Sequence, residues 1–274
     1  MLQPGVPISD DPISRDILLQ AAVAASHAAG ALLLKYAEAG FRIEYKNPVN
    51  LVTDADRAAE QCVIDCIQAH FPTHRFLAEE RGRLEETPSP YLWIIDPLDG
   101  TTNFAHGYPT YCVSIGLEYE GRCVLGVIFD PSRGELFTAV EQRGAQLNGR
   151  PIHVSNARTL DSSLLVTGFA YDIRETPHNN LDHFVRFALK AQGLRRTGSA
   201  ALDLCYVAAG RFDGFWEVRL NPWDMAAGSV IVREAGGRLT DFGGKDLSIY
   251  GRELVASNGQ IHNAMLAVLN QKTP

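Results

Sequence analysis

The sequence predicts a mixed protein with two different halves, an α+β half over residues 1–155 and an α/β half over residues 156–274. Helical periodicity opens the chain, strand-like runs with tight turns fill its middle, and strands alternate with helices afterwards. The polar stretch 155–163 is the predicted boundary. A chain of 274 residues has room for one large domain or two small ones that share a core.

Two helices are expected first. Ser14 is suited to cap a helix that runs to about Glu38, and Gly40 provides its stop. A second helix is expected over 56–69, because apolar residues recur at helical spacing until Phe71-Pro72 interrupts them. These helices should pack on the sheet that follows them.

The strands of the first half should form an antiparallel meander. The dipeptide 120–121 and the stretch 131–134 have the composition of turns, and Asn148-Gly149 is typical of a tight hairpin. The predicted strands are 91–95, which stops abruptly at Asp96, then 112–119, 123–130 and 135–140.

The second half alternates between the two kinds of element, as in a sheet covered by helices. Strands are expected over 164–169, 214–218 and 253–256, and helices over 181–192, 199–209, 224–234 and 261–269.

Composition limits the possible ligands. The formal net charge is −7, and no basic patch stands out, so nucleic acid is not expected as the main ligand. An acidic protein that handles phosphate needs local positive charge, which a bound cation can supply. The five cysteines are scattered and form no CxxC pair, which argues against a disulfide framework and a structural zinc site.

The N-terminus shows no signal-peptide pattern, and residues 1–12 are expected to be a loose tail. The most apolar early stretch, 21–34, is shorter than the ~20 apolar residues that a membrane-spanning helix needs. The sequence therefore predicts a cytoplasmic protein without a membrane segment.

The most informative segment runs from Trp93 to Phe104. A buried strand delivers Asp96, Pro97 turns the chain, and Asp99 returns to the same place three residues later. Two carboxylates so close repel each other unless a cation lies between them, and oxygen ligands suit magnesium or calcium. An EF-hand loop is rejected, because Gly107 occupies the position of its final Glu. A turn with two solvated aspartates stays an alternative for this pair alone.

Further acids end other elements, which favours a shared site. Asp224 and Asp56 taken singly are also explained as helix caps. The acids concerned are Asp54 and Asp56 after an extended run, Glu79 and Glu80 after a short apolar run, and Asp224 at the start of a helix.

Two motifs resemble the inositol monophosphatase family. Residues 96–104, Asp-Pro-Leu-Asp-Gly-Thr-Thr-Asn-Phe, match its DPxDGTxNF signature at every fixed position. Residues 223–228 and 234–237 resemble its C-terminal WDxAAG and EAGG signature. The resemblance covers nearly the whole chain and implies a layered αβαβα sandwich, usually a homodimer, and a magnesium-dependent, lithium-sensitive phosphatase that acts on a small phosphate monoester.

The resemblance also implies two to three Mg²⁺ ions per site. Glu79, Asp96 and the carbonyl of Leu98 would hold the first, and Asp96 would bridge to a second that Asp99 and Asp224 also hold. A weaker third ion would lie near Asp56 and Thr101, while Asp54 and Glu80 rank below these ligands. Glu79, Asp56 and Thr101 form the implied catalytic set, with Glu79 and Thr101 placing the attacking water.

The implied substrate contacts come from several segments. The amides of Gly100 and Thr101, at a helix start, would bind phosphate. Glu217 occupies the place of an acid that binds a ring hydroxyl; a solvated strand-end carboxylate is its alternative. Arg219 and Asn221 are candidates for tuning specificity, and Lys46 is displaced by one position from a family lysine and kept out of the site. The full implied substrate set is Asp99, Gly100, Thr101, Gly198, Ser199, Ala200, Glu217 and Asp224.

Other readings stay open at this point. An aspartyl nucleophile in Asp54-Ala55-Asp56 would form a covalent phosphoenzyme, but it leaves the motif at 96–101 unexplained. A non-catalytic phosphosugar-binding or regulatory protein is the second alternative. Within the enzyme reading, the resemblance favours inositol 1-phosphate, with fructose bisphosphate, histidinol phosphate and 3′-phosphoadenosine nucleotides as alternatives.

Overall fold

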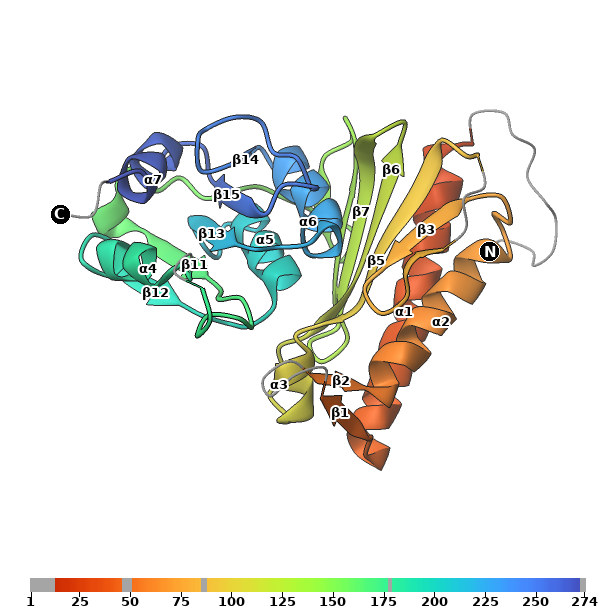
Figure 1. Cartoon of the computed structure of the whole chain (residues 1–274). Helices are drawn as coiled ribbons and strands as arrows, with labels where there is room; N and C mark the ends of the chain where they lie inside the picture. The colour runs from red at the N-terminus through yellow and green to blue at the C-terminus, as the bar shows by residue number, and fades with distance from the viewer. Residues whose placement is uncertain (1–12, 46–50, 85–87, 177–178, 272–274) are drawn as a thin grey trace.

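The chain opens with two helices that pack against each other (Figure 1). The computed structural model describes residues 13–45, 51–84, 88–176 and 179–271, so the predicted tail and Lys46 lie outside the described residues. Ser14 caps the first helix by accepting a hydrogen bond from the Asp16 amide, and Gly40 ends it, as predicted. The two helices are α1 (Arg15–Ala39) and α2 (Asp54–Gln68).

The start of α2 lies two residues earlier than predicted. The Thr53 side chain accepts from the Asp56 amide, and the Asp56 carboxylate accepts from the Thr53 amide at 2.8 Å. This capping box satisfies backbone groups that would otherwise lack partners at the helix end. A small hairpin of β1 (Ile43–Tyr45) and β2 (Leu51–Thr53) leads into it.

The first sheet contains the predicted meander. Its order is β10-β9-β8-β7-β6-β5-β3-β4, and the pairs from β5 through β10 are antiparallel. The short strand β3, which was not predicted, lies parallel to β5. Asn148 and Gly149 have φ values of 49° and 75°, as the predicted hairpin requires. The strands are β3 (Arg75–Ala78), β4 (Gly82–Leu84), β5 (Tyr91–Asp99), β6 (Cys112–Tyr119), β7 (Arg122–Asp130), β8 (Glu135–Val140), β9 (Ala145–Leu147) and β10 (Arg150–Ile152).

The sequence predicted that this strand stops at Asp96, but β5 continues to Asp99. Asp96 pairs with Ser114 and Asp99 pairs with Cys112, so β5 uses one residue more than β6 between these pairs. Pro97 cannot donate to the ladder, and a bulge here keeps both strands paired. The strand therefore carries both aspartates to its end, where α3 (Thr101–Ala105) begins.

The second sheet is mixed. β11 lies parallel to β12 and β13, while β15 lies antiparallel to β13 and β14. The helix predicted over 181–192 ends at Ala188, and β12 and β14 were not predicted because each has three residues. The elements are a 3₁₀ turn (Leu160–Ser162), β11 (Leu164–Thr167), α4 (Leu181–Ala188), β12 (Gly193–Arg195), α5 (Ala200–Ala208), β13 (Gly214–Val218), α6 (Pro222–Glu234), β14 (Arg238–Thr240), β15 (Glu253–Ser257) and α7 (His262–Leu269).

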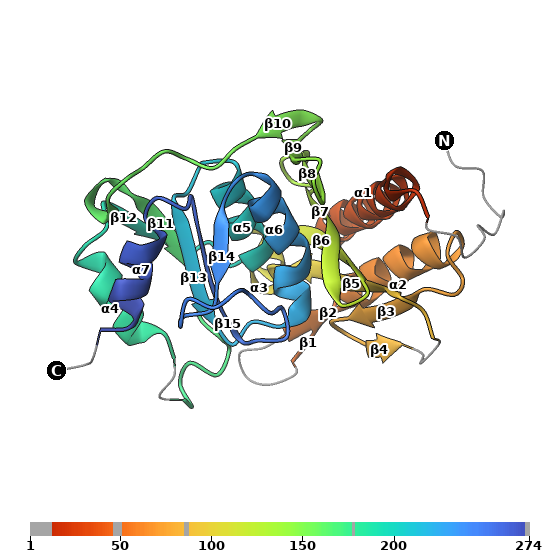
Figure 2. The ribbon, with the colours of Figure 1, turned by 90° about the horizontal axis from the view of Figure 1, so that it is seen from above.

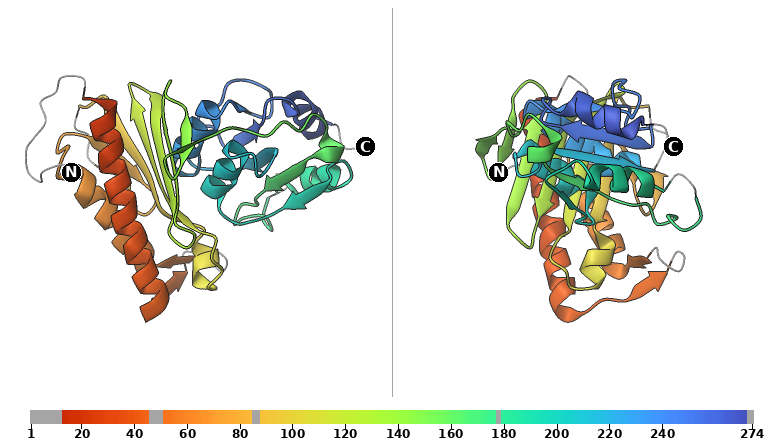
Figure 3. Two further views of the ribbon diagram at one scale, coloured as in Figure 1. Left: turned by 180° about the vertical axis from the view of Figure 1, so that it is seen from behind. Right: turned by 90° about the vertical axis from the view of Figure 1, so that its left-hand side faces the viewer.

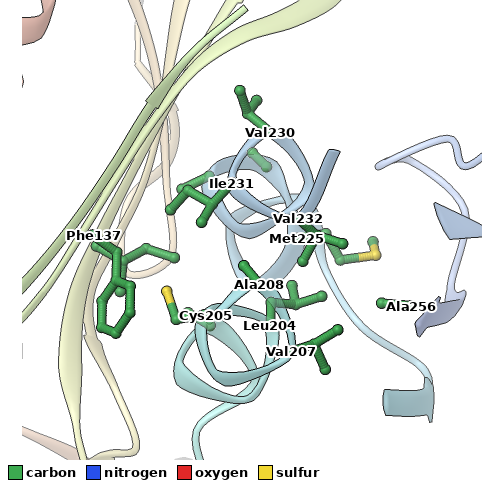
Figure 4. Packing of buried hydrophobic residues seen from close by; sticks show 14 of the residues in the cluster. Phe137, Leu204, Cys205, Val207, Ala208, Met225, Val230, Ile231, Val232 and Ala256 are labelled. Carbon is green, nitrogen blue, oxygen red and sulfur yellow. The ribbon is translucent and has the colours of Figure 1, made fainter. Parts of the chain in front are cut away.

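These elements stack as the αβαβα sandwich that was expected (Figures 1, 2 and 3). One apolar cluster joins α1 and α2 to the first sheet, a second surrounds α5 and α6 between the sheets, and a third joins the second sheet to α7. Figure 4 shows the middle layer, where Cys205 and Ile231 face Phe137 of the first sheet. A Cβ at Gly126 would lie 2.3 Å from the carbonyl oxygen of Ala227, so β7 lets α6 approach its backbone.

Helix α1 has 25 residues and is long and apolar enough to cross a membrane by length and composition alone. The prediction that its apolar stretch is too short is therefore wrong. Its buried residues, among them Leu18, Ala25 and Leu33, pack in the cluster shared with α2 and the first sheet. These contacts are those of a core helix.

Candidate active site

A cavity of about 280 Å³ lies between the β5–α3 connection and the segments around β11, β13 and the starts of α5 and α6. It contains nearly every residue that the sequence proposed for the site, drawn from segments far apart in the chain. Those residues are Glu79, Asp96, Leu98, Asp99, Gly100, Thr101, Gly198, Ser199, Ala200, Glu217 and Asp224. Asp56 does not line the cavity, and neither does Asp54.

The β5–α3 connection brings the first acids to the cavity. Asp96 is 2% exposed and accepts a hydrogen bond from the Leu98 amide at 3.0 Å. Gly100 has a φ of 101°, and a Cβ there would lie 2.8 Å from the carbonyl oxygen of Thr110. Glycine is therefore required for the turn that places the start of α3 against the cavity.

Two other helices also begin at the cavity. Asp99 connects the end of β5 to the start of α5, because its Oδ2 accepts from the Ser199 hydroxyl and from the Ala201 amide, both at 2.7 Å. Asp224, in the first turn of α6, accepts from the Asn221 amide at 2.6 Å. Helix N-termini favour anions, so this end of α3, α5 and α6 suits both carboxylates and a phosphate.

The carboxylates repel one another. Burial and the neighbouring charges of Glu79, Asp99 and Asp224 raise the pKa of Asp96 well above its usual range. Burial raises the pKa of Asp99, although its hydrogen bonds to Ser199 and Ala201 oppose the shift. Burial and the charge of Asp99 raise the pKa of Asp224 to about 8. Each shift marks a site where added positive charge would stabilise the ionised cluster.

The donors fit a hard cation. They are carboxylates and a backbone carbonyl, which suit magnesium, and among the described residues no cysteine or histidine lines the cavity. Over the described ranges, however, no three Asp, Glu, His or Cys side chains already stand together as a metal-binding cluster. Asp99 and Asp224 instead accept hydrogen bonds from helix starts. A cation would thus have to draw these side chains inward.

Asp56 lies behind the cavity wall. It is fully buried, and its Oδ1 accepts from the Thr101 hydroxyl at 3.1 Å, so it touches the cavity through Thr101. Burial raises its pKa to about 6. Asp54, the first residue of α2, does not line the cavity, and its carboxylate accepts from the Arg42 amide at 3.0 Å. A phosphate in the cavity cannot reach Asp54 directly, which disfavours the aspartyl nucleophile pair.

Glu217 is not a solvated strand-end carboxylate, because it is only 8% exposed and lines the cavity. A Cβ at Gly168 would lie 2.2 Å from Glu217 Oε2, so this glycine leaves room for the carboxylate. Burial, together with the charges of Asp203 and Asp99, raises the pKa of Glu217 well above its usual range, while Arg196 opposes the shift.

The comparisons with known proteins agree with this geometry. A model of the inositol monophosphatase family matches residues 14–273. The chain belongs to the inositol monophosphatase family. Members of this family are generally metal-dependent, and the chain is a phosphoric monoester hydrolase of the inositol monophosphatase type.

Relatives match most of the chain. An inositol-1-monophosphatase of Synechocystis is 51% identical over 220 residues, which cover 80% of this chain and 77% of that protein. Nus factor SuhB of Escherichia coli is 45% identical over 253 residues, covering 91% and 94%. The structure of an inositol monophosphatase from Anabaena has a TM-score of 0.88 and 47% identity, covering 96% of this chain and 98% of that one.

The sequence alone did not indicate several residues that line the cavity of this family member. Asp203 is buried on α5 and accepts from the Thr197 hydroxyl at 2.6 Å, so it looked like a core position of a helix. The Arg-Arg pair before Gly198 was a usable signal for Arg196, since charge next to a substrate loop is informative. Tyr171, Asp172 and Arg252 carried no signal of their own. The missed residues are Thr102, 168–172, Arg196, Asp203, Val218, Leu220 and Arg252.

Proposed function

We propose that this chain catalyses the Mg²⁺-dependent hydrolysis of a small polyol phosphate monoester, with myo-inositol 1-phosphate as its substrate. The observation that carries the proposal is the cavity itself, where mutually repelling carboxylates meet the N-termini of α3, α5 and α6. Acids that need a cation and amides that suit an anion are the two requirements of metal-assisted phosphate hydrolysis.

The metal ligands in this proposal are those of the family motif. Glu79, Asp96 and the carbonyl of Leu98 would hold one Mg²⁺, and Asp96, Asp99 and Asp224 a second. A weaker third would lie near Thr101 and Asp56. When bound, the ions would neutralise phosphate oxygens, lower the pKa of a water and stabilise the leaving alkoxide.

The protein's own groups position the reactants. The Thr101 hydroxyl donates to Asp56, so its oxygen lone pairs can accept a hydrogen bond from the attacking water. Glu79 lines the same cavity and would receive that water's proton. The amides of Gly100 and Thr101 would hold the phosphate oxygens at the start of α3. No covalent phosphoenzyme is required.

The substrate's hydroxyls would be recognised on the opposite wall. Glu217 can accept hydrogen bonds from ring hydroxyls, and Ser199 and Ala200 bring the start of α5 close to the ring. The name of the Synechocystis relative, an inositol-1-monophosphatase, supports this choice of substrate.

A hydrolysis panel with Mg²⁺ tests the proposal. Inositol 1-phosphate, fructose 1,6-bisphosphate, histidinol phosphate and a 3′-phosphoadenosine nucleotide are compared by phosphate release, with EDTA as the control. The highest kcat/KM should belong to inositol 1-phosphate, and EDTA should abolish release of phosphate. A higher kcat/KM for another of these substrates would reassign the proposed activity to that substrate. Turnover in excess EDTA would exclude the metal mechanism.

A homodimeric, cytoplasmic and lithium-sensitive enzyme completes the proposal, since the family resemblance implies these properties. Analytical ultracentrifugation and a lithium titration of turnover test the first and the last. A monomer, or turnover indifferent to lithium, would remove that property from the proposal.

A second candidate function is regulation through a protein partner, because the relative from E. coli is named a Nus factor. The variant Asp99→Asn distinguishes the two functions, because it should remove turnover and leave a surface for a protein partner unchanged. If cells that lack this protein have a phenotype, and the Asp99→Asn variant restores them fully, the role behind that phenotype is independent of hydrolysis.

A further inference from the structure

The loop that follows β11 covers one side of the cavity and has no part in the function proposed above. Tyr171 and Asp172 of this loop line the cavity. The Tyr171 hydroxyl shares a hydrogen bond with the Thr102 side chain on α3, and Asp172 forms an ion pair with Arg219. The loop is therefore tied to α3 by Tyr171 and to the end of β13 by Asp172.

Arg219 is held in an unusual backbone conformation. Its φ is 64°, in the left-handed region that residues with a Cβ seldom occupy. Its amide donates to the Arg252 carbonyl, and the Arg252 guanidinium donates to the Arg219 carbonyl at 3.4 Å. These reciprocal contacts fix the backbone from which the Arg219 side chain reaches Asp172.

A second cavity, of about 800 Å³, lies next to the first. Residues of α4, α7 and the chain around β15 line most of it. Val218, Arg219 and Arg252 line both cavities, so these side chains form the partition between them. The larger cavity is thus adjacent to the proposed substrate site, and Arg219 of the Asp172–Arg219 pair lies between the two cavities.

Asp172 also has unused hydrogen-bonding capacity. Its Oδ2 contacts Arg219, while its Oδ1 is buried and has no hydrogen-bond partner in the described part of the chain. A carboxylate accepts several hydrogen bonds, so this oxygen can receive a donor such as a substrate hydroxyl after a small shift of the loop.

We propose that the Asp172–Arg219 pair sets the size of the leaving group, keeping the active site selective for monoesters of small, single-ring polyols. The pair closes the partition, so a bulky leaving group such as a nucleoside cannot extend into the neighbouring cavity. This inference rests on the proposed function and deepens it. Breaking the pair opens the partition and adds room that only a large ester can use.

Two variants break the pair with little risk to the fold. Arg219→Gly removes the guanidinium and suits the positive φ, because glycine occupies that region without strain. Asp172→Asn keeps the shape of the side chain and removes its charge. Arg143→Ala is the control, since Arg143 also forms an Arg–Asp ion pair, with Asp16, on a more exposed surface away from both cavities. The double variant tests whether the two residues act as a unit.

The measurement is the ratio of kcat/KM for adenosine 2′-monophosphate to kcat/KM for inositol 1-phosphate, with Mg²⁺ saturating. Arg219→Gly and Asp172→Asn should each raise this ratio about tenfold, which corresponds to ~1.4 kcal/mol, mainly through KM. The double variant should exceed either single variant by less than twofold, and Arg143→Ala should match wild type.

A ratio that stays at the wild-type value in both single variants would overturn the inference, as would an equal rise in Arg143→Ala or strictly multiplicative effects in the double variant. These results leave the proposed function standing as long as the wild-type protein hydrolyses inositol 1-phosphate. Absence of that wild-type activity would instead refute the proposed function.

Discussion

Replacing Asp224 by asparagine should remove activity and, at the same time, stabilise the metal-free protein. Asp224 lies at the cavity with its carboxylate against Asp99, and burial and this neighbour raise its pKa to about 8. Its hydrogen bond from the Asn221 amide can also be accepted by an asparagine side-chain oxygen. The substitution thus keeps the cap of α6. It removes a carboxylate whose ionised form is unfavourable at this site unless a cation is bound.

The size of the effect follows from the pKa of Asp224. The folded protein retains the proton up to about pH 8, whereas the unfolded chain loses it near pH 3.8, the ordinary pKa of an aspartate, so stability falls as pH rises between these values. One such group lowers the free energy of unfolding by ~1.4 kcal/mol per pH unit, or ~2–3 kcal/mol from pH 5 to pH 7. Asp224→Asn lacks this contribution, because an asparagine side chain is uncharged in both the folded and the unfolded chain.

Urea unfolding in EDTA at pH 5, 6 and 7 measures the difference, with both proteins compared at each pH. The free energy of unfolding of the variant should fall less steeply with pH, and at pH 7 the variant should be the more stable protein. Mg²⁺ should then stabilise wild type more than the variant, since a ligand stabilises only the state that binds it. Equal pH slopes, or a variant that is less stable at pH 7 in EDTA, would refute this account of the cluster.

The remaining predictions concern the site and its support. Asp99→Asn should fold and lose ~10²–10³ in kcat, as removal of comparable electrostatic stabilisation does; Asp54→Asn should be far milder, and a total loss there would favour a covalent mechanism. Glu217→Ala should cost ~1–3 kcal/mol in kcat/KM for inositol 1-phosphate through unpaired hydroxyls, but less for p-nitrophenyl phosphate, with unchanged magnesium affinity by calorimetry; an equal fall for both substrates would place it among the metal ligands or in the core. Calcium added to the Mg²⁺-loaded enzyme should suppress turnover, because calcium is larger and coordinates more loosely, and unaffected phosphate release would contradict this. Gly126→Val should lower the midpoint of urea unfolding, because a Cβ would lie 2.3 Å from the carbonyl oxygen of Ala227, and a wild-type midpoint would show that α6 can move away from β7.

Much of the fold could be predicted because its causes are local. Ser14 and Gly40 bound α1 through capping, Asn148-Gly149 makes a tight hairpin, and strands β6 and β8 have the predicted limits. Local patterns failed where elements are too short to show a period, as in β12 and β14. The division into halves at residue 155 stays a prediction.

The acids at the site were also visible in the sequence. The motif that holds Asp96 and Asp99 repeats a family signature, and this similarity, rather than spacing, assigned roles to Glu79 and Asp224. Those roles stay predictions until metal binding is measured.

The sequence by itself indicated the family and the approximate position of the longer elements, because the signature motifs, caps and periodic patterns each depend on residues close together in the chain. The metal ligands it indicated stay a prediction. Only the tertiary structure decided which side chains share the cavity. It placed Asp56 behind Thr101, buried Glu217 against Gly168, and joined Asp172 to Arg219. Such contacts join segments of separate elements, and their geometry depends on how the two sheets pack around α5 and α6, which no local pattern encodes.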